Sequence, residues 1–257
     1  WTPTVGDSWN YNLQTPVKVN VDVDVVFMDM DDDTSQTKIN QLHNNGKAVV
    51  CYISIGSWEE WRDDAAEFPD SALGNALDGW PDEKWLDVTN SNVQDIMAAR
   101  VAQAASMDCD GVEPDNMSVS FEDDTGVDVS EEDLIAYNTW FAEIVHVAGM
   151  KVGLKNTLEL VNTTLADSFD FAINEECLEY NECDVSTPGL DDYKDTFLAQ
   201  GKPVFNVEYV NNLTMCDEAN ALGLDTIIKN YDVDRFFCSC SDPSRSFKCI
   251  DEVLNKD

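Results

Sequence analysis

Short apolar runs alternate along the chain with longer segments of helical periodicity. Eight of these runs have the length of a buried strand, and several are rich in Val, Ile and Phe. They lie at residues 9–13, 23–28, 48–55, 111–112, 152–154, 169–173, 204–207 and 226–228. Strands separated by helices predict a parallel sheet, and strands that are apolar throughout predict a sheet buried on both faces.

Three segments between the runs have the pattern of an amphipathic helix. The clearest begins after Ser130, which forms a capping-box sequence with Asp133, and ends before Gly149. A second helix is predicted over 93–104, and a short third helix ends at Gly46.

The number of strands and the length of the chain together predict the fold. Eight strands alternating with helices in 257 residues indicate a single (β/α)8 TIM barrel that spans residues 1–257. An open doubly wound sheet is the alternative, but no Gly-x-Gly-x-x-Gly fingerprint follows the first strand.

The charge of the chain excludes several classes of partner. Asp and Glu number 51 against 15 Lys and Arg, which gives a formal net charge of −36. Such a surface repels phosphate backbones, so nucleic-acid binding is excluded, and it argues against docking on anionic lipid. No apolar run approaches the roughly 18 residues of a membrane span. A cationic partner or a high-salt habitat is favoured instead.

Eight cysteines predict disulfides rather than a metal site. None has the C-x-x-C spacing, and two histidines are too few for a Cys/His site. Disulfides, together with a first residue that is Trp rather than Met, predict a secreted, extracellular protein. The cysteines are Cys51, Cys109, Cys177, Cys183, Cys216, Cys238, Cys240 and Cys249.

Two disulfide pairings follow from the predicted barrel. Cys51 opens the third strand and Cys109 precedes the fourth, so both lie at the bottom of adjacent strands and are predicted to pair. Cys177 and Cys183 lie in one loop after the sixth strand and are also predicted to pair. The connectivity of the other four stays open.

Polar side chains follow the apolar runs directly, where a buried carboxylate is costly unless it is used or paired. A barrel carries its chemistry at these carboxyl ends of its strands. The two histidines, His43 and His146, lie in helical segments instead, so a histidine triad or a metal-dependent deacetylase is not expected. Paired Asp and Glu residues suit glycoside hydrolysis, with no metal or cofactor. Aromatic residues that could stack on sugars are Trp9, Tyr11, Tyr52, Trp58, Trp61 and Tyr209.

Five segments match the motifs of a known family in the expected order. They are Val-Cys-Tyr-Ile-Ser-Ile-Gly-Ser at 50–57, Asp-Gly-Val-Glu-Pro-Asp-Asn at 110–116, Gly-Leu-Lys-Asn at 153–156, Phe-Asp-Phe-Ala-Ile-Asn-Glu-Glu-Cys at 169–177 and Gly-Lys-Pro-Val-Phe-Asn-Val-Glu-Tyr at 201–209. They resemble strands three to seven of the endo-α-1,4-polygalactosaminidase family of glycoside hydrolases. The resemblance implies a secreted (β/α)8 barrel that cleaves α-1,4-linked galactosamine polymers internally.

The resemblance also implies the site. Its catalytic acids correspond to Asp115 and Glu175; Glu176 stands where the motif usually has a neutral residue, and strand alternation favours Glu175. Asp115 is expected to stay ionised as nucleophile or base, whereas burial and like charge are expected to raise the pKa of Glu175, the expected acid. The predicted substrate-binding residues are Asp29, Tyr52, Trp58, Glu113, Asn116, Lys155, Asn156, Asn174, Glu208 and Tyr209.

Three other functions compete with this interpretation. A non-catalytic carbohydrate-binding barrel would keep the aromatic residues. A Schiff-base aldolase could use Lys155 or Lys229, although Lys155 is more readily explained as the partner of a carboxylate. Calcium could bind at 29–33, but Thr34 replaces the glycine of an EF-hand loop. The favoured partner of the chain, expected as a monomer, is a cationic galactosamine-containing polysaccharide.

Overall fold

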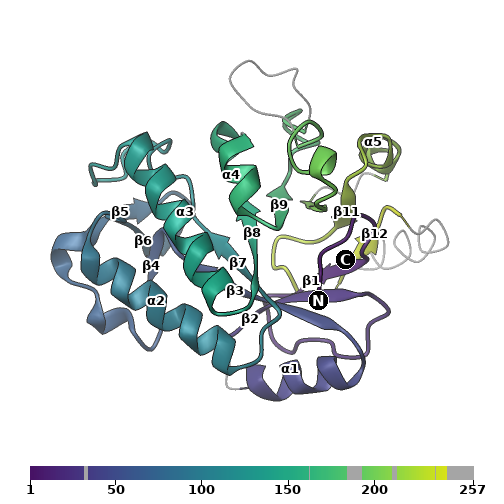
Figure 1. The fold of residues 1–257 in the computed structure, drawn as a ribbon, viewed down its shortest axis with the longest axis horizontal. Coiled ribbons are helices and arrows are strands. Elements are labelled where there is room, and N and C mark those ends of the chain that lie inside the picture. Colours follow the sequence, from purple (N-terminus) through teal and green to yellow (C-terminus); the bar gives the residue numbers. More distant parts are fainter. Residues whose placement is uncertain (32–33, 162, 184–192, 210–212, 235, 242–257) are drawn as a thin grey trace.

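The computed structural model describes residues 1–31, 34–161, 163–183, 193–209, 213–234 and 236–241. One curled sheet forms the centre of the molecule (Figure 1), with the strand order β1-β2-β3-β7-β8-β9-β10-β11-β12. The strands up to β11 are parallel, and β12 is antiparallel to β11. Their bounds are Trp9–Tyr11, Val25–Asp29, Ala48–Ser54, Gly111–Asp115, Lys151–Lys155, Phe171–Glu175, Val204–Glu208, Asp225–Ile228 and, for β12, Cys238–Ser239. All eight predicted strands are therefore present.

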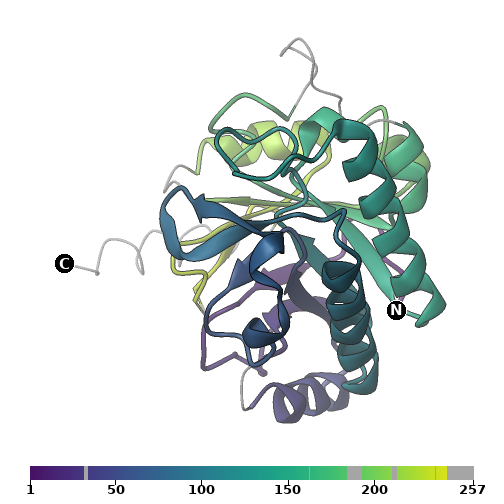
Figure 2. The ribbon, with the colours of Figure 1, turned by 90° about the vertical axis from the view of Figure 1, so that its left-hand side faces the viewer.

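The curl of this mixed α/β sheet is consistent with a (β/α)8 barrel. The first and last parallel strands, β1 and β11, lie close together: the Trp9 indole N–H of β1 donates a hydrogen bond to the Asp225 carbonyl of β11 at 2.6 Å. Helices lie around the outside of the sheet in Figure 2. They are α1 (Ser35–Asn44), α2 (Ser91–Ser106), α3 (Glu131–Val147), α4 (Thr163–Ser168) and α5 (Met215–Leu222).

The helices pack on one face of the strands, and aromatic rings fill the other. Side chains alternate between the faces, so Trp9, Phe27, Phe171 and Phe205 point inward and form one buried cluster. Their rings contact one another edge-on or tilted, at centroid distances such as 5.1 Å for Trp9–Phe27 and 5.7 Å for Phe171–Phe205. Gly153 makes room for this cluster, because a Cβ there would lie 2.5 Å from the Phe171 ring.

The three predicted helices are confirmed as α1, α2 and α3. The capping box of α3 is present, with the Ser130 hydroxyl accepting from the Asp133 N–H and the Asp133 carboxylate accepting from the Ser130 N–H. Within the described residues, no helix is long and apolar enough to cross a membrane.

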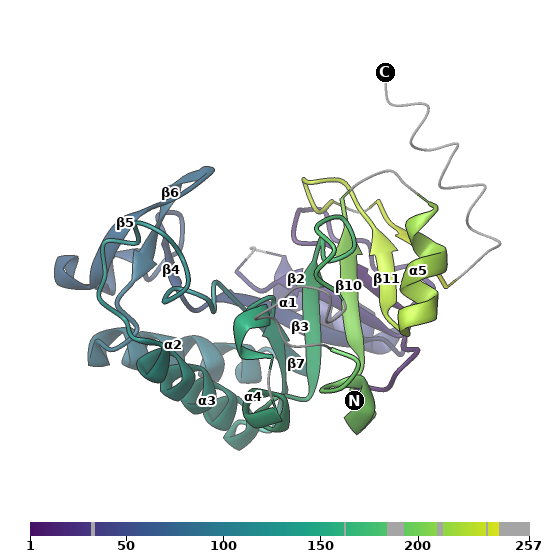
Figure 3. The ribbon, with the colours of Figure 1, turned by 90° about the horizontal axis from the view of Figure 1, so that it is seen from above.

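A second, three-stranded antiparallel sheet is inserted between β3 and α2 and was not predicted. It consists of β4 (Ser57–Glu59), β5 (Leu73–Leu77) and β6 (Trp80–Leu86), in the order β4-β6-β5. Figure 3 shows it to one side of the large sheet, on the side of α2 and α3. The chain enters it through Gly56, where a Cβ would lie 1.7 Å from the Asn116 carbonyl oxygen, so only glycine permits this approach.

Both predicted disulfides are confirmed, as Cys51–Cys109 and Cys177–Cys183. A third joins Cys216 to Cys240 and ties α5 to the end of the sheet. Of the two remaining cysteines predicted to form disulfides, Cys238 lies on β12 and Cys249 lies outside the described residues.

Replacing Cys51 and Cys109 together by alanine should lower the free energy of unfolding by about 2–5 kcal/mol. The bond joins positions 58 residues apart, so its loss frees a long loop of the unfolded chain. Urea unfolding measures the effect. The control is the double alanine variant of Cys177 and Cys183. The disulfide lost in this variant closes a loop of only 6 residues, so the free energy of unfolding should fall by less. An equal loss in both variants would contradict the loop-length argument.

Candidate active site

The inward-pointing side chains at the carboxyl ends of the strands converge on one place. Alternation puts every second residue of a strand inside the sheet, so the last inward positions form a polar layer above the aromatic cluster. That layer contains Tyr11, Tyr52, Asp115, Lys155, Glu175 and Tyr209.

Lys155 lies at the centre of this layer with its side chain only 1 % exposed. Its ammonium nitrogen lies 2.7 Å from Glu113 Oε1, 3.3 Å from Glu175 Oε2 and 3.7 Å from Asp115 Oδ1. It also donates a hydrogen bond to the Tyr11 hydroxyl at 2.8 Å. Burial alone would lower the pKa of Lys155, but the surrounding carboxylates raise it well above its usual value. The predicted pairing of Lys155 with a carboxylate is confirmed.

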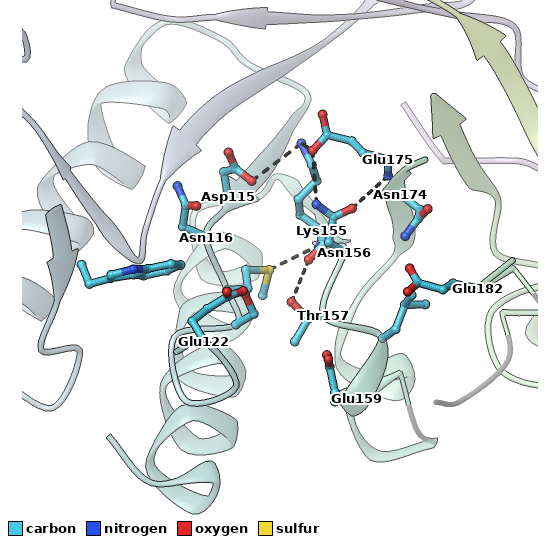
Figure 4. A pocket seen from close by; sticks show the side chains of 14 residues that line it. Asp115, Asn116, Glu122, Lys155, Asn156, Thr157, Glu159, Asn174, Glu175 and Glu182 are labelled. Atoms are coloured by element: carbon cyan, nitrogen blue, oxygen red, sulfur yellow. Dashed lines mark hydrogen bonds and ion pairs between the residues drawn. The ribbon is translucent and has the colours of Figure 1, made fainter. Parts of the chain in front are cut away.

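Asp115 ends β7 and Glu175 ends β9, and the two face each other across Lys155 (Figure 4), which ends the strand between them, β8. Because one nitrogen reaches both, the two contacting carboxylate oxygens lie no more than about 7 Å apart, a spacing at which both can act on one glycosidic bond. Tyr52 donates to Asp115 at 2.9 Å, and Tyr209 and Asn156 donate to Glu175.

The pKa of Glu175 differs from the sequence expectation. Burial does raise it, as expected, but the Lys155 ammonium and the hydrogen bonds from Tyr209 and Asn156 outweigh burial, so the pKa is lowered overall. The expectation was wrong because it counted the acidic neighbours and not these donors. Burial instead raises the pKa of Glu113, which lies fully buried against Lys155, to about 7.

Two cavities meet at Asp115, Lys155 and Glu175. The smaller has a volume of about 290 Å³, and acidic residues such as Glu122 and Glu159 line its outer part (Figure 4). The larger has a volume of about 760 Å³ and extends between the large sheet and the inserted sheet. A chain-like ligand could therefore extend from the two carboxylates in both directions.

Aromatic side chains line the larger cavity. Trp61 and Trp80 come from the inserted segment and are more than half exposed. Tyr209 and Tyr231 stack at a centroid distance of 4.9 Å on the opposite wall. Exposed aromatic faces of this kind suit sugar rings. The aromatic candidate Trp9 is instead buried in the interior cluster.

Arg62 and Asp29 form another part of that wall. Arg62 binds Asp29 at 2.8 Å and Asp31 at 3.1 Å, so these two carboxylates already have a cationic partner. This arrangement does not favour the calcium alternative at 29–33, of which residues 32–33 lie outside the described residues. Sequence reasoning missed Arg62, although cations are scarce enough in this chain to single it out.

Most of the predicted substrate-binding residues lie at the two cavities. Asn116, Lys155 and Asn156 line both. The larger cavity is also lined by Asp29, Tyr52 and Tyr209, whereas Asn174 lines the smaller one.

Three predicted binding residues lie elsewhere. Glu113 is buried beneath Lys155, and Trp58 donates its indole N–H to the Ala65 carbonyl. Glu208 points to the other face of β10, because its neighbour Val207 belongs to the interior cluster. There it accepts hydrogen bonds from the backbone N–H groups of the loop after β9.

The remaining titratable candidates have structural partners. His43 and His146 lie in helices, as predicted, beside Asp110 at 2.8 Å and Asp170 at 2.7 Å. Glu176 is turned away from Glu175 and accepts a hydrogen bond from Tyr231. In the part of the chain that the structure describes, Cys177, Cys183 and Glu208 cluster like metal ligands, but the two sulfurs are bonded to each other.

A curled parallel sheet with facing carboxylates at its carboxyl edge and aromatic walls is an arrangement typical of glycoside hydrolases. The chain belongs to glycoside-hydrolase family GH114, whose sequence profile matches residues 1–245. The family resemblance of the strand motifs is thereby confirmed.

Solved structures agree with this assignment. Aspergillus fumigatus Ega3, crystallised in a complex with galactosamine, is 34% identical, with a TM-score of 0.83 over 93% of this chain and 97% of that one. The glycoside hydrolase domain of PelA from Pseudomonas aeruginosa, at 13% identity and a TM-score of 0.65, covers 90% of this chain and 97% of its own. A GH18 chitinase from Pseudoalteromonas aurantia shares the fold at 11% identity and a TM-score of 0.53, over 97% and 99% of the two chains. No curated protein matches this chain.

Proposed function

We propose that this protein is a secreted, endo-acting glycoside hydrolase that cleaves α-1,4-linked galactosamine polymers. A single (β/α)8 barrel domain carries the site, with Asp115 and Glu175 as its carboxylate pair. The facing of these two carboxylates across Lys155 is the observation that carries the proposal. Membership of GH114 and the likeness to Ega3, a protein solved with galactosamine, support the substrate class.

The reaction needs one carboxyl to protonate the leaving oxygen while the other attacks C1 or activates water. Lys155 lies within ion-pair distance of both, and its positive charge helps to lower the pKa of Glu175 in the free protein. In the predicted division of roles, Asp115 is the nucleophile or base and Glu175 is the acid. Glu175 must therefore take up a proton although the positive charge of Lys155 lowers its pKa.

The cavities on both sides of the pair support internal cleavage. A polymer bound at Asp115 and Glu175 can continue into the larger, aromatic-walled cavity and into the smaller, acidic one. The net charge of −36 supports a cationic polymer, since it steers ammonium-bearing chains toward the protein.

The proposal is tested by incubating the protein with an α-1,4-galactosamine polymer and following reducing ends and product lengths. Long products early in the reaction are expected from an endo-acting enzyme. Binding without new reducing ends would identify the non-catalytic carbohydrate-binding alternative. The aldolase alternative is disfavoured for Lys155, because its ion pairs keep the amine protonated and therefore non-nucleophilic.

Replacing Tyr209 by phenylalanine should move one limb of the pH–rate profile to higher pH. The Tyr209 hydroxyl donates to Glu175 and lowers its pKa, so removing the hydroxyl raises that pKa. Whether Glu175 acts as base or as acid, the limb that reports its titration then moves upward. The matched control is Tyr231→Phe, which removes a donor to Glu176 instead. A profile that shifts equally in both variants, or in neither, would contradict the role of Glu175.

A further inference from the structure

Glu83 is a buried acid in the larger cavity that the proposed reaction does not use. It lies on β6 of the inserted sheet, is only 7% exposed, and lines the cavity that contains Asp115 and Glu175. Sequence reasoning missed it, because nothing in its segment predicts burial.

The residue paired with Glu83 across the inserted sheet is also an acid, but in the part of the chain that the structure describes it has cationic partners that Glu83 lacks. Glu83 pairs with Glu59 of β4, which puts two acids directly opposite each other. Glu59 is neutralised by Arg62 at 2.7 Å and by Arg100 at 3.7 Å. Among the described residues, Glu83 has no ion pair of its own. One of its oxygens accepts a hydrogen bond from the Ser57 hydroxyl at 2.7 Å, and the other has no donor within the described part of the chain.

The orientation of Glu83 is set by a chain of side chains that ends beside Asp115. Because the Ser57 hydroxyl donates to Glu83, it accepts from Ser54, at 2.6 Å, and from the Asn116 amide, at 3.1 Å. Asn116 directly follows Asp115 in the chain, so the hydrogen bonds tie the position of Glu83 to that of the proposed catalytic carboxylate.

An acid in this environment is costly to the fold. Burial, together with the charges of Glu59 and Asp115, raises the pKa of Glu83 to about 7, although Ser57 and Arg62 oppose the shift. A buried carboxylate without a cation destabilises the folded state unless a ligand supplies the counter-charge.

We propose that Glu83 binds the ammonium group of a galactosamine residue in the larger cavity and so selects de-N-acetylated polymer. The inference rests on the proposed function and names a residue that determines its specificity. An ammonium group offers three donors and a full positive charge, which match the free oxygen and the missing cation of Glu83. An N-acetyl group has no charge and would leave the carboxylate unpaired. Ser57 is then a positioning residue, since it holds the other oxygen.

The test compares wild type and Glu83→Gln on two polymers of equal length, one free of N-acetyl groups and one half N-acetylated. The isosteric amide should lower kcat/KM on the free amine by about 10- to 100-fold, through KM, as expected for losing a hydrogen bond between charged groups. The kcat/KM of the variant on the half N-acetylated polymer should fall by a smaller factor. Mass spectrometry of the products of this polymer should show a weaker preference for free amines beside the cleaved bond. Ser57→Ala should change the same preference to a smaller extent.

The control is Asp82→Asn, which removes an equal charge from the exposed neighbour on the same strand and should leave the preference unchanged. Urea unfolding of Glu83→Gln should occur at an equal or higher midpoint, because the variant relieves an unpaired buried charge; a merely structural role would lower the midpoint. A kcat that falls equally on both polymers would overturn the proposal and make Glu83 a catalytic acid. If wild type cleaves neither polymer, the proposed function fails, and calorimetry of galactosamine oligosaccharide binding to wild type and Glu83→Gln still tests this site.

Discussion

Asp115→Asn and Glu175→Gln should each fold normally and each lose hydrolysis by about 10²-fold or more. Each change removes one of the two carboxylates that face each other across Lys155, and the reaction needs both. The substituted amides keep the size of the side chains, so the hydrogen bonds from Tyr52 and Tyr209 retain acceptors. Initial rates on the galactosamine polymer measure the loss, and circular dichroism verifies the fold.

The leaving group separates the roles of the two acids. A variant without its general acid should recover much of its rate on a substrate with an activated aryl leaving group, whereas a variant without its nucleophile or base should not. Recovery is predicted for Glu175→Gln. Glu176→Gln is the matched control and should keep near-wild-type turnover, since Glu176 is turned toward Tyr231. Near-wild-type turnover of Glu175→Gln, with loss in Glu176→Gln, would show that the pair has been misassigned.

Lys155→Met should cause the largest loss of stability of any single change in the site. The variant keeps an unbranched apolar stem close to the size of the lysine stem but removes the cation from a place where three carboxylates contact it. Removing one partner of a buried ion pair costs about 3–5 kcal/mol, because the remaining charges stay buried without compensation. Urea unfolding at neutral pH measures the difference. Lys151→Met, on the same strand but in a partly exposed pair with Asp170, should cost about 1 kcal/mol or less.

The loss in Lys155→Met should depend on pH in a defined direction. In the wild type the folded-state pKa of Glu175 is lowered, so this group contributes stability above its unfolded pKa and loses it as pH falls. Without Lys155, burial dominates and the folded-state pKa values of Glu113 and Glu175 rise, so the variant loses stability as pH rises above the unfolded values. The difference between the two proteins should therefore shrink toward pH 4. A difference independent of pH would point to packing rather than charge.

Local patterns were enough to predict the large sheet and the helices that cover it. Most strands of that sheet carry buried apolar residues on both faces, and the capping box before α3 is a local signal. The acids of the site follow these runs directly, so Asp115 and Glu175 could be located from the strands and the motifs alone. Glu208 shows the limit of this reasoning, since one step along a strand moves a side chain to the other face.

The inserted sheet and its acids could not be predicted in the same way. Three of the seven residues of β6 are exposed, and one of its buried residues is the charged Glu83. Its hydrogen bond to Ser57 joins side chains 26 residues apart in the sequence. No apolar alternation marks such a strand, because an acid occupies one of its buried positions and exposed residues fill its first half. The predicted rise in the pKa of Glu175 was wrong for a related reason, since Lys155 and Tyr209 contact this carboxylate from other parts of the chain.

The inserted sheet leaves and re-enters the main fold at almost the same point. Its two ends are joined by a hydrogen bond from the Leu86 N–H to the Gly56 carbonyl, at 2.9 Å, beside the carboxyl end of β3. A segment with adjacent ends can be exchanged for another of different length without disturbing the strands on either side. Residues 57–86 can thus be treated as an exchangeable segment: grafting them between relatives would transfer Trp61, Trp80 and Glu83 of the larger cavity while Asp115 and Glu175 stay in place.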